Sequence, residues 1–242
     1  MTQSETGHTK IQTNFFTLKT FCASYSPNYL PTNPQITIPA LTTHHAAAKT
    51  AIEAVSQHKV PFARAQGARY LIFKPLKPLT TRILSSLKSV NAPETTIKDA
   101  QQITRKIQGT KKRKTQTPDD TTKDPISTSQ QSYDMKLDHF KKLVELLIAE
   151  ILYAPNETDL KTASLLTLIT TLDTANQAVI TAYVPYSNAL ITRNTVLYAP
   201  ETGIIDLSKD VKNYIKSLFG FNSPQFKQTN AIRFRYPRNH YR

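Results

Sequence analysis

The chain has 242 residues and a formal net charge of +14 at pH 7, from 31 Lys and Arg against 17 Asp and Glu. Its five glycines are too few for a strand-rich fold or for glycine-rich phosphate loops, so the composition favours helices joined by proline-containing corners. The lone Cys22 excludes an intrachain disulfide and a cysteine-based zinc site. Because the N-terminus is polar and no long apolar run is free of charge, we expect a cytoplasmic protein without a membrane-spanning segment.

In the first half of the chain, residues 15–35 are expected to be irregular because they hold three closely spaced prolines. An alanine-rich helix is predicted over residues 37–59, with Thr37 as its N-cap. Helical periodicity continues over residues 62–73. Pro61, which separates the two stretches, therefore either opens a new helix or kinks a continuous one.

Two further helices are predicted before the middle of the chain, one over residues 79–87 and one from Pro93 to Gly109, which ends it. Residues 110–130 have no hydrophobic periodicity and are interpreted as a flexible linker. The linker carries a cluster resembling a nuclear-localisation or nucleic-acid patch, a weak signal by itself: Lys111, Lys112, Arg113 and Lys114.

The clearest helix of the chain is predicted over residues 133–151, where apolar side chains recur at spacings of four and three and form one stripe against a partner helix. We expect this helix to have no counterpart of equal length ahead of the predicted helices of the first half. Asn156 is expected to cap the next helix. Pro185 repeats the role of Pro61, and a helix to Tyr198 follows it. The last long helix is predicted over residues 204–219, with the following glycine as its stop.

Four predicted helix ends carry an aromatic residue just before a proline corner: Tyr25, Phe73, Tyr153 and Tyr198. Residues near such prolines are pushed out of the α region, so we expect helices to end there and the rings to seal the ends of the bundle. An aromatic binding cage is the functional alternative.

The sequence also repeats itself at a fixed offset of 124 residues. Within residues 36–72, ten positions are identical to the residue 124 positions later: Leu41, Thr43, Thr50, Ala51, Ala54, Val55, Val60, Pro61, Ala65 and Arg69. Self-similarity at a fixed period indicates a duplicated structural unit. We therefore expect an all-α fold of two tandem, internally duplicated helical-bundle modules joined by a flexible basic linker.

The expected layout has five segments. They are an N-terminal segment 1–24, a first module 25–109, the linker 110–130, a second module 131–230, and a basic aromatic C-terminal arm 231–242. The repeat-equivalent pairs Pro61 with Pro185 and Arg69 with Arg193 are interpreted as structural, and anion binding by the two arginines is the alternative.

No catalytic or metal-binding pattern stands out. The adjacent His44 and His45 point about 100° apart on a helix and cannot share one ion. His139 is expected to be solvated and Cys22 to be buried. Nucleophile-elbow, zinc-protease, phosphate-loop and dinucleotide motifs are all missing. We therefore predict a protein that is not an enzyme and has no cofactor, no metal and no small-molecule substrate.

The C-terminal arm is the best binding candidate because arginines, which pair with phosphates, are interleaved with rings, which can stack on bases. Its candidate residues are Arg233, Phe234, Arg235, Tyr236, Arg238, Tyr241 and Arg242. The alternative is an arm that packs on its own bundle and leaves its arginines in water. Residues 1–110 carry 13 Lys and Arg against four Asp and Glu. The first half of the chain is therefore basic, as the arm is.

Six segments of the chain resemble a family of uncharacterised bacterial proteins with the same two-part layout and a basic or proline-containing linker. They are FKPLKPLTTRILSSLK, ITRKIQG, SQQSYD, LYAPNETDL, VLYAPETG and DVKNYIKSLFG. The resemblance covers nearly the whole chain and implies no activity and no functional residues.

Together these patterns predict a non-enzymatic helical binding or scaffold protein whose basic first module and arm contact nucleic acid or another polyanion. The alternative is a protein–protein interaction module, or a self-associating homo-oligomer, that uses apolar helix faces such as the stripe of residues 133–151.

Overall fold

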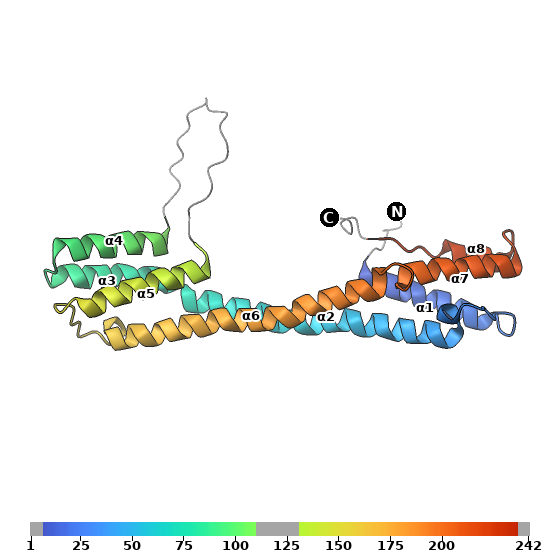
Figure 1. Cartoon of the computed structure of the whole chain (residues 1–242), viewed down its shortest axis with the longest axis horizontal. Helices are drawn as coiled ribbons and strands as arrows, with labels where there is room; N and C mark the ends of the chain where they lie inside the picture. Colours follow the sequence, from blue (N-terminus) through green and yellow to red (C-terminus); the bar gives the residue numbers. More distant parts are fainter. Residues whose placement is uncertain (1–6, 110–130, 237–242) are drawn as a thin grey trace, which may run out of the picture. The chain divides into compact units, whose positions relative to one another are not determined.

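The computed structural model describes residues 7–109 and 131–236, and the regular elements within them are all helical. The predicted all-α class is therefore confirmed. In chain order the elements are α1 His8–Ser24, η1 Pro34–Ile36, α2 Ile38–Phe73, α3 Leu76–Ser89, α4 Glu94–Gln108, α5 Tyr133–Ala149, η2 Thr158–Leu160, α6 Thr162–Tyr198, α7 Ile204–Phe219 and α8 Pro224–Ala231 (Figure 1). In the described part of the chain, no helix has both the length and the hydropathy needed to cross a bilayer.

The helices form two compact units. Unit 1 consists of Met1–Pro61 and Tyr183–Arg242, and unit 2 consists of Phe62–Ala182. Because both boundaries fall inside long helices, α2 and α6 each contribute residues to both units. The compact units therefore do not coincide with the expected modules 25–109 and 131–230, since each unit takes residues from both.

The two repeat-equivalent prolines lie close to this division, Pro61 at the boundary and Pro185 two residues beyond Tyr183. Pro61 lies inside the 36-residue α2 and Pro185 lies inside the 37-residue α6. Of the two alternatives for Pro61, the continuous helix is the one observed. A proline inside a helix removes one backbone hydrogen bond. Neither helix ends at its proline, and each therefore contributes residues to both units.

Unit 1 contains a helix where the sequence pattern predicted irregular chain. The residues that α1 buries are spaced by four, three and four, which places them on one face: Ile11, Phe15, Leu18 and Cys22. This face packs against α7. The irregular assignment of residues 15–35 is therefore wrong up to Ser24, because the prolines follow the helix instead of interrupting it. The expectation about helix lengths is also wrong, since α1 and α5 both have 17 residues.

Unit 2 buries the predicted stripe of α5. Leu137, Phe140, Val144 and Leu147 are at most 5% exposed and pack against α4, which itself packs on α3. The end of the stripe differs from the prediction, because Ile151 lies beyond the helix and is 92% exposed.

The buried face of α5 is wider than its apolar stripe. His139, expected to be solvated, is 3% exposed, so this prediction is wrong. The reason lies in the helix geometry: His139 is four residues before Leu143, which is also fully buried, so both lie on one face beside the predicted stripe. Burial lowers the pKa of His139, and the positive charge of Lys106 on α4 lowers it further.

Two of the four aromatic corners place a buried ring at a helix end, as expected. Phe73 and Tyr198 are the last residues of α2 and α6, and both are buried. Tyr153, also buried, donates its hydroxyl proton to the carbonyl of Leu160 at 2.9 Å. This bond holds the turn that enters η2. Asn156 therefore does not cap a helix: the chain forms η2 first, and α6 begins at Thr162.

Other predicted helix boundaries agree with the structure. The backbone N–H of Ala40 donates to the Thr37 hydroxyl at 3.4 Å, as expected of an N-cap. Gly109 and Gly220 follow α4 and α7 with φ of 78° and 88°, a conformation that favours glycine.

Candidate polyanion-binding surface

Three lysines lie on one face of α7. Lys209, Lys212 and Lys216 are three and four residues apart, so their side chains follow one stripe of the helix. A different stripe, which includes Leu207, Val211 and Ile215, is buried in the core of unit 1. The amphipathic pattern of α7 thus places its lysines at the surface while its apolar face is held in the core.

Each of these ammonium groups stands over an aromatic ring. Lys209 Nζ lies 5.4 Å from the ring centroid of Tyr236, Lys212 Nζ lies 5.2 Å from that of Phe234, and Lys216 Nζ lies 5.3 Å from that of Phe221. These distances are within the range of cation–π attraction. Two of the three rings belong to the C-terminal arm. The lysine row, which consists of Lys209, Lys212 and Lys216, is therefore also the surface against which the arm packs.

The described part of the arm alternates in burial. Ile232, Phe234 and Tyr236 are half-buried against the core of unit 1, whereas Arg233 and Arg235 are exposed. This is the period of two expected of an extended segment that packs on one side. Of the two alternatives for the arm, the observed geometry of residues 233–236 matches the one in which the arm packs on its own bundle.

Hydrogen bonds hold the arm at three points. Lys212 Nζ donates to the carbonyl of Ile232, and Asn14 Nδ2 of α1 donates to the carbonyl of Arg233 at 2.8 Å. Tyr236 donates its hydroxyl proton to Asp206 Oδ1 at 3.0 Å. Since the partners come from α1 and α7, the backbone that carries Arg233 and Arg235 is held in a defined position.

The electrostatics of the row follow from these contacts. The hydrogen bond from Lys209, 2.7 Å long, lowers the pKa of Asp206, and the bond from Tyr236 acts in the same direction. Burial lowers the pKa of Lys212, and the positive charge of Arg233 lowers it further. Cations on this surface therefore lie close enough to repel one another, and a bound anion would relieve this repulsion.

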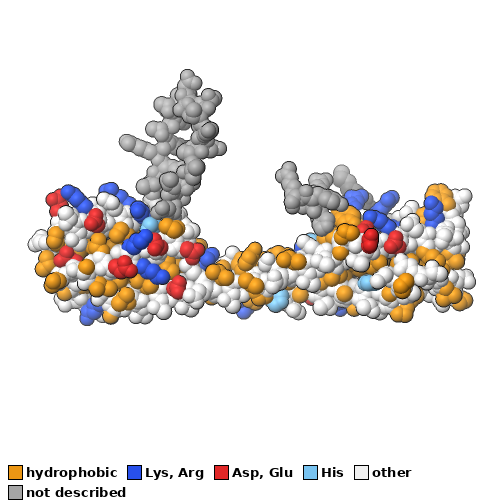
Figure 2. All heavy atoms as spheres, in the orientation of Figure 1, with side chains coloured by type: hydrophobic (Ala, Val, Ile, Leu, Met, Phe, Trp, Pro, Cys, Tyr) orange, Lys and Arg blue, Asp and Glu red, His pale blue; other side chains and the backbone are white. Residues whose placement is uncertain are grey.

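The excess of positive charge is larger in unit 1 than in unit 2. Among the described residues, unit 1 carries eleven Lys and Arg against four Asp and Glu, and unit 2 carries thirteen against nine. On the face drawn in Figure 2, the Lys and Arg side chains of unit 1, on the right, have acidic side chains among them. Unit 1 thus carries an excess of positive charge without being of one sign only.

The other candidate residues stand apart from this surface. Arg69 stacks its guanidinium on Tyr133, with Cζ 4.0 Å from the ring centroid, and its Nε is buried without a hydrogen-bond partner. It lines a groove of about 520 Å³ within unit 2 whose remaining walls are alanine, threonine and Ile72. Its repeat equivalent Arg193 instead donates two hydrogen bonds to Asn194, at 2.7 and 3.1 Å. The pair therefore shares a sequence position but not a set of partners.

Several candidates lie outside the described residues: Lys111, Lys112, Arg113, Lys114, Arg238, Tyr241 and Arg242. The described residues contain no group of three or more His, Cys, Asp or Glu side chains that could hold a metal ion. The sequence reasoning missed the lysine row of α7, although its spacing of three and four residues was visible. What the spacing could not reveal is that two rings of the arm pack beneath these lysines.

No family model, no curated protein and no solved structure matches the chain. The resemblance to a family of uncharacterised bacterial proteins accordingly stays an expectation from the sequence. The fold and this surface define the class of an all-helical protein with a cationic face.

Proposed function

We propose that this protein is a non-enzymatic, cytoplasmic helical binding protein that contacts nucleic acid or another polyanion through the cationic surface of unit 1. The observation that carries the proposal is the pair of exposed guanidinium groups, Arg233 and Arg235, on a backbone held against α7. An arginine whose backbone is already positioned loses less conformational entropy when it pairs with phosphate.

The contact that we propose is electrostatic and independent of base stacking. Phe234 and Tyr236 are half-buried beneath the lysines of α7, so their faces are occupied by contacts within unit 1. Arginines and lysines remain to meet a row of phosphates, a mode of binding that releases counterions and tolerates any sequence. We therefore expect little preference between single-stranded sequences of different base composition.

The experiment is a titration of fluorescein-labelled oligonucleotide with the full chain at several salt concentrations, starting at about 50 mM, where phosphate contacts are strong. The test variant is the double substitution Arg233→Gln with Arg235→Gln. Because each phosphate contact contributes roughly 0.7 to 0.9 to the slope of log affinity against log salt, this variant should bind more weakly and lose about 1.5 from that slope.

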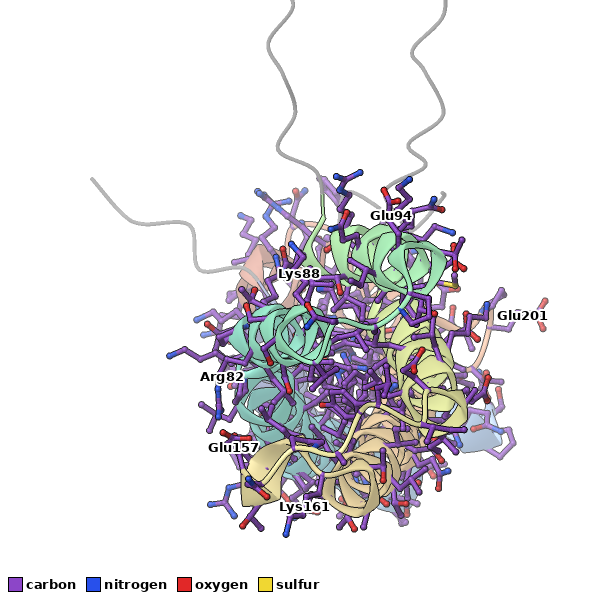
Figure 3. All side chains as sticks on the ribbon, turned by 90° about the vertical axis from the view of Figure 1, so that its left-hand side faces the viewer. Arg82, Lys88, Glu94, Glu157, Lys161 and Glu201 are labelled. Carbon is purple, nitrogen blue, oxygen red and sulfur yellow. The ribbon has the colours of Figure 1, made fainter. Side chains whose placement is uncertain are left out.

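The matched control is Lys88→Gln with Lys161→Gln. Both lysines are exposed, belong to unit 2 and are labelled in Figure 3, and their loss changes the net charge by the same amount. We expect the control to keep the affinity and slope of the parent protein. Absence of binding at about 50 mM salt, or equal weakening in test and control variants, contradicts the proposal.

We also propose that the chain consists of two copies of one helical module joined by a basic linker. The order of elements supports this proposal: a 17-residue helix, a three-residue 3₁₀ turn and a long helix with an internal proline occur twice. On this proposal each compact unit combines the beginning of one copy with the end of the other, since the unit boundaries follow Pro61 in α2 and Ala182 in α6.

A further inference from the structure

A hollow of about 230 Å³ lies within unit 2, where the ends of four helices meet. Its walls come from the end of α2, the first turn of α3, the last turn of α4 and the first turn of α5. Three buried apolar side chains form part of its lining: Phe73, Leu76 and Ile107. The hollow thus has an apolar side that a hydrocarbon group can contact.

Three lysines from different elements line the same hollow. They are Lys74 at the corner after α2, Lys77 of α3 and Lys136 of α5, and no acidic residue is among the lining residues. Lys77 Nζ donates to the carbonyl of Gln108 at 2.6 Å, which caps the end of α4. The nearest carboxylate in sequence, Asp134, accepts a hydrogen bond from Asn176 of α6. The hollow is therefore cationic on one side.

Tyr133 contacts residues of both the apolar side and the cationic side of the hollow. Its ring lies 4.8 Å from that of Phe73 in an edge-to-face arrangement, and Lys136 Nζ lies 5.6 Å from its centroid. Arg69 contacts the same ring, which adds a fourth cation to the neighbourhood. Burial lowers the pKa of Lys136, and the charge of Lys77 lowers it further, so these ammonium groups repel each other.

We propose that this hollow binds a phosphate monoester of a small aromatic or aliphatic group, with the phosphate between Lys74, Lys77 and Lys136 and the apolar group against Phe73 and Leu76. Three ammonium groups without an acidic neighbour favour a dianion over a singly charged carboxylate. The apolar wall favours an esterified phosphate over the inorganic ion. This site is separate from the arm and independent of the function proposed above.

The test uses the full chain and phenyl phosphate as the probe, with the dissociation constant measured by isothermal titration calorimetry. We expect saturable binding that Lys74→Gln and Lys136→Gln each weaken by about tenfold, the effect of one charged hydrogen bond. Lys74 is exposed, so its substitution tests the site even if loss of the half-buried Lys136 disturbs the fold. The matched control is Lys141→Gln, an exposed lysine of the same helix α5 that does not line the hollow.

Further probes and variants separate the site from general surface charge. Inorganic phosphate and benzoate should both bind more weakly than phenyl phosphate, and the variant with Arg233→Gln and Arg235→Gln should bind phenyl phosphate as the parent does. Bound probe should also raise the pKa of Lys136, followed by NMR of the lysine side chains. Absence of saturable binding, equal weakening by Lys141→Gln, equal binding of inorganic phosphate or benzoate, or an unchanged Lys136 pKa in the bound state overturns the proposal.

Discussion

Tyr29 donates its hydroxyl proton to the carbonyl oxygen of Ile36 over 2.8 Å, inside the core of unit 1. The same bond recurs in unit 2, where Tyr153 donates to Leu160 over 2.9 Å. Both tyrosines are at most 6% exposed, and each bond ties the turn after a 17-residue helix to a short 3₁₀ helix. The two bonds therefore fix the entry into each of the long helices α2 and α6.

The first prediction concerns these two bonds. Tyr29→Phe and Tyr153→Phe should each lower the free energy of unfolding by about 1 kcal/mol or somewhat more, because each leaves a carbonyl without its buried donor. Urea unfolding followed by circular dichroism measures the change. The control is Tyr70→Phe, since Tyr70 is 56% exposed. A loss in Tyr70→Phe equal to that in the buried variants contradicts this account.

The second prediction concerns the thiol of Cys22, which is fully buried in unit 1. Burial raises its pKa to about 12, so the reactive thiolate is scarce at neutral pH as well as inaccessible. The native protein should therefore react with Ellman's reagent far more slowly than the same protein in guanidinium chloride, which should release one equivalent promptly. Rapid labelling of the native protein would place Cys22 at the surface and contradict the packing of α1.

The third prediction is a loss of stability in alkali. Burial raises the pKa of Tyr153 from 10 to about 12, and the charge of Glu157 raises it further. A group whose folded pKa is raised stabilises the fold fully below its unfolded pKa, and this contribution is lost as the pH rises through the folded pKa.

Stability should therefore fall between about pH 10 and pH 12, with tyrosinate absorbance appearing as the helical signal is lost. Burial raises the pKa of Tyr29 and Tyr198 as well, so they add to the fall with the same sign. Tyr153→Phe should reduce the steepness of stability against pH in this window. An identical pH profile in the variant would show that Tyr153 ionises as freely as it does in the unfolded chain.

The fourth prediction follows from the division into units. Residues 1–109 and residues 131–242, co-expressed as separate chains with a tag on one of them, should purify together and show the helical content of the intact protein. The reason is that the core of unit 1 combines Phe15 and Leu41 from the first segment with Leu197 and Val211 from the second. Separate elution of two folded, monomeric segments would mean that each sequence copy forms its own core.

Much of the secondary structure was predictable because it depends on local spacing. The boundaries of α7 and its glycine stop, the end of α4 at Gly109 and the stripe of α5 from Leu137 to Leu147 all agree with the sequence pattern. The prediction for α1 was wrong although Phe15 and Leu18 also have a helical spacing, because the prolines that indicated irregular chain lie just beyond the end of the helix.

The candidate surface was predictable only in part. The arm was recognised by its alternating arginines and aromatics, and its extended form agrees with that pattern for residues 233–236. Its orientation was not predictable, because either set of alternating side chains could face a partner. Contacts with Lys209 and Lys212, more than twenty residues earlier in the chain, decide that the rings face inward and the arginines outward.

By itself the sequence determined that the chain is helical, where most helices end and which face of each is apolar, since these properties depend on residues within a few positions of one another. The tertiary structure alone decided which faces meet. Pro61 and Pro185 lie inside unbroken helices, so α2 and α6 carry each half of the chain into both units. The burial of His139 and the partial burial of Lys136 likewise depend on helices that are distant in sequence. The physical reason is that a local pattern specifies a surface to be buried, whereas its partner is selected by packing over the whole chain.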